Sequence, residues 1–171
     1  MINNRRIELV KKLVGIFVEK LLEYHKDRII SIILFGSYAR GNFKSTSDID
    51  ILIIMENLPK SRFKRYKLIV DAIDYVENIR ERLAGLGIYT GISPVILDLE
   101  EAKYFRPLYL DLVYDSIILY DKNNFFKNLM KRVSEYINKF QGKRIWIGNR
   151  WYWIFKKGNI FIELDRVKLI E

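Results

Sequence analysis

Two aspartates at the start of an apolar strand constrain this chain more than any other feature of its sequence. Asp48 and Asp50 open the run 48–55, in which every other residue is apolar. Residues i and i+2 of a strand point to the same face, so these two carboxylates project together. Neighbouring carboxylates repel each other and are costly to bury unless a proton or a cation neutralises them. Mg²⁺ suits this position, because it prefers oxygen ligands and also binds phosphate oxygens.

A glycine–serine turn lies between this strand and the one before it. Residues 28–35 are mostly β-branched and apolar, as expected for a strand that is covered on both faces. Gly36, at the end of that strand, lets the backbone turn sharply and lets a ligand approach it closely. Ser37 is expected to cap a short helix over residues 38–40, where free N–H groups and the Arg40 guanidinium favour an anion. A phosphate site and a metal site side by side are what phosphoryl transfer requires.

The two motifs together, GSYARG at 36–41 and SDIDILII at 47–54, resemble the nucleotidyltransferase superfamily related to DNA polymerase β, and most closely its minimal, small-domain branch. Either motif alone is common by chance, whereas both at this spacing between two apolar strands are specific. The alternative, a capped turn and a surface pair of aspartates, does not explain why two acids begin a strand buried on both faces.

The resemblance implies roles for five of these residues. Gly36 and Ser37 would contact the β- and γ-phosphates of an NTP substrate, and Arg40 would support their loop. Asp48 and Asp50 would be the catalytic residues and would hold two Mg²⁺ ions as cofactors. Two metals about 3.5–4 Å apart can activate the attacking oxygen and stabilise the leaving pyrophosphate. The expected reaction is the transfer of a nucleoside monophosphate from an NTP to a hydroxyl acceptor, with release of pyrophosphate.

The third carboxylate of the family's metal site is missing where it is expected. In the family it lies on a later strand and is the usual general base; here that strand is expected at 88–97, and the matching position falls near Ser93. Asp98 lies five residues further on with the opposite parity, placed to cap the next helix in a capping box with Glu101. Asp98 as the third ligand stays open. Without such a ligand the chain would be a catalytically weak or inactive nucleotide- or nucleic-acid-binding module of the same fold.

The order of the expected elements favours an α/β (α+β) fold, a mixed sheet flanked by helices, as the resemblance also implies. Strands are expected at 28–35, 48–55, 88–97 and 116–120, and helices at 4–25, 62–84, 99–106 and 124–140. We expect this nucleotidyltransferase domain to span residues 1–141. A basic, aromatic β-hairpin extension, 142–171, is expected to form short strands at 144–148, 150–155 and 160–164, with turns at Asn149 and 157–159.

Nearly all of the excess positive charge lies near the end of the chain. Residues 122–171 hold 12 of the 30 Lys and Arg residues but 4 of the 21 Asp and Glu residues, together with all three tryptophans. The extension is therefore either a stacking and cationic platform for RNA, or an apolar hairpin that packs on the domain or on a second copy in a homodimer. Alternation along the strands favours packing, because it places the aromatic rings on one face.

Composition bounds the partners and the location. The chain has no cysteine, no apolar run long enough to span a membrane and no signal-peptide pattern, so we expect a soluble, cytoplasmic protein without disulfides. A chain of 171 residues leaves little room for its own acceptor-binding domain, which favours a partner or a dimer that supplies this surface. By resemblance, the acceptor is a small molecule, a protein or a helical toxin that AMP transfer inactivates. A basic cluster within 60–67 either steers the triphosphate or is simply solvated.

Overall fold

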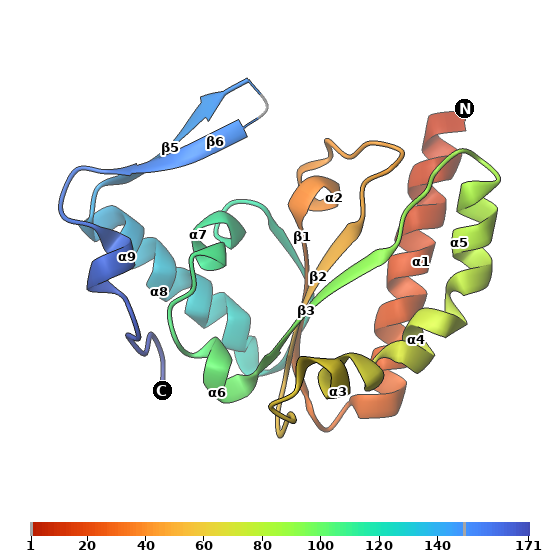
Figure 1. Cartoon of the computed structure of the whole chain (residues 1–171), viewed down its shortest axis with the longest axis horizontal. Helices are drawn as coiled ribbons and strands as arrows, with labels where there is room; N and C mark the ends of the chain where they lie inside the picture. Colours follow the sequence, from red (N-terminus) through yellow and green to blue (C-terminus); the bar gives the residue numbers. More distant parts are fainter. Residues whose placement is uncertain (1, 149) are drawn as a thin grey trace.

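The computed structural model describes residues 2–148 and 150–171, and in this part of the chain a four-stranded mixed sheet forms the centre of the molecule (Figure 1). In spatial order its strands are β3 (Ile92–Asp98), β2 (Ile49–Met55), β1 (Ile29–Phe35) and β4 (Ser116–Asp121). β1 runs antiparallel to β2 and to β4, whereas β2 and β3 are parallel. A parallel pair needs a crossover connection, which the helices between β2 and β3 provide.

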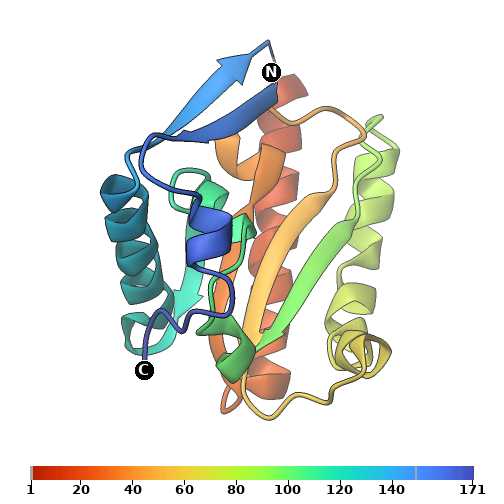
Figure 2. The same cartoon turned by 60° about the vertical axis from the view of Figure 1, so that its left-hand side comes forward.

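Helices cover both faces of this sheet (Figures 1 and 2). One face carries α1 (Ile2–His25), α4 (Val70–Tyr75) and α5 (Glu77–Ala84), and α3 (Arg62–Lys67) lies beside β3. The other face carries α8 (Phe125–Lys139), preceded by the 3₁₀ turn η1 (Lys122–Asn124), with the short helices α6 (Leu99–Ala102), α7 (Leu108–Leu112) and α9 (Ile160–Glu163). The predicted fold class is therefore confirmed. Among the described residues, no helix combines the length and the apolar character that crossing a membrane would require.

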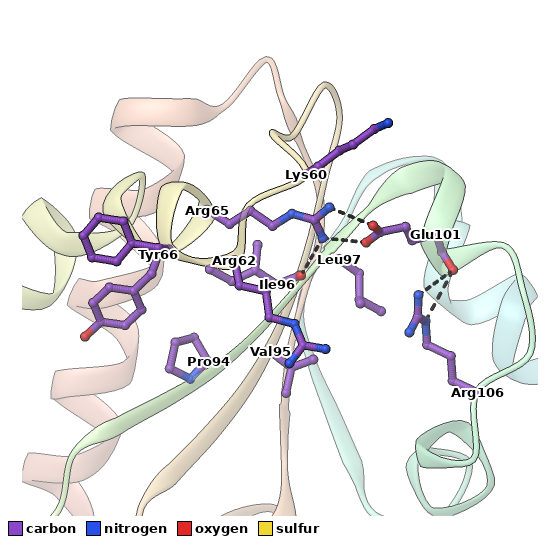
Figure 3. A pocket seen from close by; sticks show the side chains of 11 residues that line it. Lys60, Arg62, Arg65, Tyr66, Pro94, Val95, Ile96, Leu97, Glu101 and Arg106 are labelled. Atoms are coloured by element: carbon purple, nitrogen blue, oxygen red, sulfur yellow. Dashed lines mark hydrogen bonds and ion pairs between the residues drawn. The ribbon is translucent and has the colours of Figure 1, made fainter.

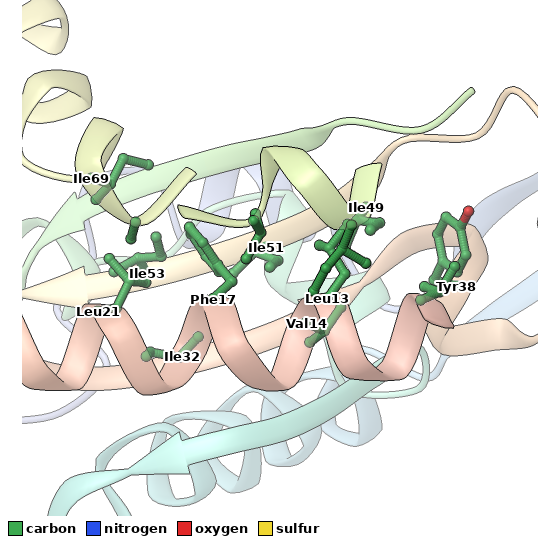
Figure 4. Packing of buried hydrophobic residues seen from close by; sticks show 14 of the residues in the cluster. Leu13, Val14, Phe17, Leu21, Ile32, Tyr38, Ile49, Ile51, Ile53 and Ile69 are labelled. Atoms are coloured by element: carbon green, nitrogen blue, oxygen red, sulfur yellow. The ribbon is translucent and has the colours of Figure 1, made fainter. Parts of the chain in front are cut away.

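The two inner strands are buried on both faces, so their side chains divide by parity between two cores. Ile51 belongs to the same core as Phe17 of α1 (Figure 4). Leu52 points the other way and shares a core with Leu129 of α8. All four side chains are fully buried. Asp50 has the parity of Leu52 and therefore opens toward the α8 face of the sheet.

The helix predicted over 62–84 is three shorter helices, α3, α4 and α5. The chain departs from helical geometry at Ile69 (φ −112°, ψ −3°) and at Val76 (φ −94°, ψ 0°). Both side chains are buried, so each bend keeps an apolar residue against the sheet. The His25 ring, with Nε2 2.6 Å from the Leu68 carbonyl oxygen, satisfies a polar group at the first break. Neither break residue is a proline or a glycine, which is why the sequence pattern runs through both.

The predicted hairpin is present in the C-terminal segment. β5 (Gly142–Ile147) and β6 (Arg150–Phe155) pair antiparallel and form a sheet of their own. The predicted turn residue Asn149 lies outside the described residues. The inward rings of β6, Trp153 and Phe155, pack against the α8 core.

The strand predicted at 160–164 is wrong, because this segment forms α9. Asn159 caps the helix, its side chain accepting the Phe161 N–H at 3.0 Å. Ile160 and Leu164, four residues apart, are both buried in the α8 core, which suits a helical turn.

Candidate functional site

The two aspartates lie at the start of β2, between both neighbouring strands. Asp50 is paired with Phe35 on β1 and with Ser93 on β3. Burial raises the pKa of the Asp50 carboxyl, and the nearby Asp48 carboxylate raises it further, whereas the Ser93 hydroxyl and the Arg40 guanidinium lower it. Asp48 precedes the strand, and its Oδ1 accepts the N–H of Gly91 at 3.3 Å. The site therefore disfavours the charged form of the Asp50 carboxyl, chiefly because it is buried.

The turn after β1 touches this carboxylate pair. Gly36 adopts a left-handed backbone conformation with φ +72°. An added Cβ at this glycine would lie 2.2 Å from Oδ2 of Asp50, far inside any allowed contact. The sequence predicted that the turn and the strand start would converge, and the structure brings them into contact. Glycine is required here both by its backbone angle and by the carboxylate beside it.

Ser37 and Arg40 lie on the short helix α2 (Gly36–Arg40) that follows the turn. The expectation that Ser37 caps this helix is wrong, because Ser37 lies in the first turn of α2. Phe35 holds the N-cap position and makes no side-chain hydrogen bond there. The Ser37 hydroxyl has no hydrogen-bond partner among the described residues. The Arg40 guanidinium is already paired within the chain, because its Nη1 lies 3.5 Å from Oδ2 of Asp115. Its Cζ lies 4.7 Å from the centre of the Trp151 ring.

Asp115 joins the C-terminal hairpin to this helix. Its side chain is buried and accepts hydrogen bonds from Arg144, from Nη1 at 2.5 Å and from Nη2 at 3.2 Å. It also accepts one from Arg40. A second tether lies one helical turn earlier, where Asp111 Oδ1 accepts the indole N–H groups of Trp151 at 2.8 Å and Trp153 at 3.0 Å. The sequence interpretation missed both acids. Their i, i+4 spacing is the one signal that they share a face of a helical turn.

Asp98 does not complete the carboxylate pair. Its backbone pairs with Met55 at the far end of β2 from Asp50. Its side chain accepts the Glu100 N–H at 3.0 Å while Glu101 accepts the Asp98 N–H at 3.1 Å, which is the predicted capping box. The position beside Asp50 is held by Ser93. Within residues 2–148 and 150–171, no group of three His, Cys, Asp or Glu side chains is arranged to hold a metal ion.

A separate basic cavity of about 620 Å³ lies between α3 and the outer edge of β3 (Figure 3). Arg65 crosses it and pairs with both oxygens of Glu101 at 2.5 and 2.7 Å, while its other donors reach the carbonyls of Pro59 and Ile96. The Arg65 hydrogen bond holds the pKa of Glu101 below its ordinary value. Arg65, one member of the predicted basic cluster, is therefore a structural residue. Its neighbour Lys60, which also lines the cavity, has no ion-pair partner among the described residues.

Residues 12–106 match a family model described as "Nucleotidyltransferase domain". A Methanocaldococcus jannaschii protein named "Putative protein adenylyltransferase" is 34% identical over 136 residues, which cover 78% of this chain and 87% of that protein. A second protein of the same organism and name is 30% identical over 86 residues, covering 43% of this chain and 83% of its own. A crystal structure described as a toxin–antitoxin with AMP-PNP superposes with a TM-score of 0.47 at 20% identity, over 74% of this chain and 89% of the other.

Proposed function

Because the chain belongs to the nucleotidyltransferase domain family, we propose that it transfers AMP from ATP to a hydroxyl group of a protein. The observation that carries this proposal is the contact between the turn and the carboxylate pair, where a Cβ on Gly36 would lie 2.2 Å from Asp50 Oδ2. A phosphate held at the turn would therefore lie next to any cation held by the two aspartates. The name of the Methanocaldococcus relative supports AMP as the transferred group and a protein as the acceptor.

The carboxylate pair fits a hard divalent cation. Asp48 and Asp50 supply oxygen ligands. Burial and, to a smaller extent, the Asp48 carboxylate raise the pKa of Asp50, and a bound cation would offset both effects by favouring the charged form. We propose these two residues as the ligands of two Mg²⁺ ions. When bound, Mg²⁺ would neutralise the developing charge on the pyrophosphate and lower the barrier to attack by the hydroxyl.

The other residues of the turn would bind and orient the triphosphate. Gly36 leaves its backbone open to the β- and γ-phosphates, and the Ser37 hydroxyl, which has no partner among the described residues, is available to them. Arg40 lies near Asp50 and is held by Asp115, so it supplies a fixed positive charge beside the turn. These assignments make Arg40 a residue that binds and positions, while Asp48 and Asp50 carry the chemistry.

A second candidate function follows from Ser93. This residue stands beside Asp50 where the family's third carboxylate is expected, and a serine hydroxyl is no general base near neutral pH. The chain would then bind ATP and Mg²⁺ while transferring AMP slowly, unless the acceptor or a partner supplies the base. The alternative is thus a nucleotide-binding module with weak or absent catalysis.

ATP labelled at the α-phosphate tests both candidates. We expect label on a protein acceptor, on a co-purified helical toxin partner or on the chain itself, dependent on Mg²⁺, and none from ATP labelled at the γ-phosphate. Asp48→Asn and Asp50→Asn are the controls and should abolish labelling. Saturable ATP binding without any labelled acceptor would support the binding module, and absence of both would refute the assignment. Sedimentation of the same samples reports whether the acting species is a homodimer.

A further inference from the structure

The inner face of the hairpin carries a row of groups that begins at the candidate phosphate turn. Arg40, at the end of α2, lies 4.7 Å from the Trp151 ring. Trp151 pairs across the hairpin with Trp146, and the two ring centres are 4.9 Å apart. α2 is five residues long, about 7.5 Å at 1.5 Å per residue. The Trp146 ring is therefore separated from the turn by one short helix, one arginine side chain and one other ring.

Trp146 differs from the other two tryptophans in what its ring and its N–H do. The indole N–H groups of Trp151 and Trp153 are both bound to Asp111. The N–H of Trp146 has no hydrogen-bond partner among the described residues, and the residue is 45% exposed although it lies on the inner face. The Arg144 guanidinium lies 5.1 Å from its ring centre. A large aromatic face with a cation beside it is thus left open next to the site.

We propose that Trp146 is the platform on which the base of the bound nucleotide stacks. This inference rests on the proposed function, because the phosphates must lie at the Gly36–Ser37 turn for the base to reach the hairpin. Every base has a π-face, and base–aromatic stacking strengthens binding about tenfold or more. A single open ring suits one base. Single-stranded RNA would need several rings free to stack on successive bases. The rings of Trp151 and Trp153 are instead held in place by their hydrogen bonds to Asp111.

The test compares ATP with inorganic tripolyphosphate, which has the same phosphates and no base. Calorimetry with Mg²⁺ measures both ligands on the parent chain, on Trp146→Leu and on Tyr152→Leu. Tyr152 is the matched control, because it is 46% exposed on the same hairpin and faces outward. Thermal melts check that each variant folds, and Trp146→Phe keeps a stacking ring.

We expect Trp146→Leu to weaken ATP binding about tenfold or more and to leave tripolyphosphate binding unchanged, with partial rescue by Trp146→Phe. Tyr152→Leu should alter neither affinity. Unchanged ATP affinity in Trp146→Leu overturns the inference, and so does an equal loss for both ligands, which would mean that the ring only shapes α2. A short RNA that binds the parent and is lost in Trp146→Leu, with ATP unaffected, also overturns it in favour of RNA. Failure of the parent to bind tripolyphosphate and ATP would instead overturn the proposed function beneath it.

Discussion

The contact between Gly36 and Asp50 allows a prediction with an internal control. Gly36 and Gly41 share nearly the same backbone angle, φ +72° and +73°, but a Cβ at Gly41 would meet nothing within 4 Å. Gly41→Ala should therefore cost only the left-handed backbone penalty, about 1–2 kcal/mol of unfolding free energy. Gly36→Ala carries the same penalty and also forces the Asp50 carboxylate aside, which adds about 1–3 kcal/mol. We expect a total loss of about 2–5 kcal/mol.

A double-mutant cycle with Asp50→Ala separates the two terms. That change removes the oxygen at 2.2 Å and the Cγ at 3.1 Å, and leaves the Asp50 Cβ at a tight 3.3 Å. In this background Gly36→Ala should cost only slightly more than Gly41→Ala does in the parent, so the coupling energy should be about 1–3 kcal/mol. Urea unfolding of the metal-free variants measures it. Equal costs for the two glycines and a coupling energy near zero would refute the reasoning.

Three further predictions concern the acids and their partners. Burial raises the pKa of Asp50, so the folded chain holds this proton more tightly and the stability of the fold falls as the pH rises through the raised pKa. Metal-free Asp50→Asn should therefore have a higher melting temperature than the parent at about pH 7. Melts across pH should show this difference vanishing below the unfolded pKa of 3.8. Arg65→Met should lower the unfolding free energy by about 2 kcal/mol or more, because it leaves the partly buried carbonyls of Pro59 and Ile96, and Glu101, without their donor. Since Arg65 lowers the pKa of Glu101, the parent loses this stabilisation as the pH falls through the lowered pKa, and urea titrations of the variant should show no such loss. Ser93→Asp should place a third carboxylate beside Asp50. Repulsion among the three should lower the melting temperature of the metal-free protein, while the rate of Mg²⁺-dependent AMP transfer should rise. An unchanged rate with intact Mg²⁺ binding would exclude Ser93 as the cause of slow catalysis.

The sequence predicts the part of the site that is formed by residues close together in the chain. The apolar runs on either side of Gly36, with Asp48 and Asp50 two residues apart, predict a strand, a turn and a second strand without reference to the rest of the chain. The segment 160–164 shows the limit of such patterns, because a short apolar run fits a strand or a buried helical turn equally well. There the cap formed by Asn159 decides the outcome.

Contacts between distant segments could not be predicted in the same way. The position near Ser93 was expected only from the family resemblance, because it depends on the register of β3 on β2, which pairs Ser93 with Asp50. The pairing of Asp115 with Arg144 has no spacing that marks it, since the two residues are 29 positions apart in the sequence. Sequence reasoning placed the positive charge of the extension correctly but could not say that part of it is matched within the same chain.

That internal matching changes how the extension should be regarded. Arg144 pairs with Asp115, a side chain that also holds Arg40 of the candidate phosphate turn. Further along, Ile160 and Leu164 lie in the same buried core as residues of α8, on the other side of the predicted boundary at 141. The extension therefore contributes apolar burial to the domain and a charge contact to the site at once. Removing it would leave Asp115 without its bidentate partner Arg144 and Arg40 without the Trp151 ring, so we expect the proposed nucleotide binding to depend on residues that lie outside the matched family segment 12–106.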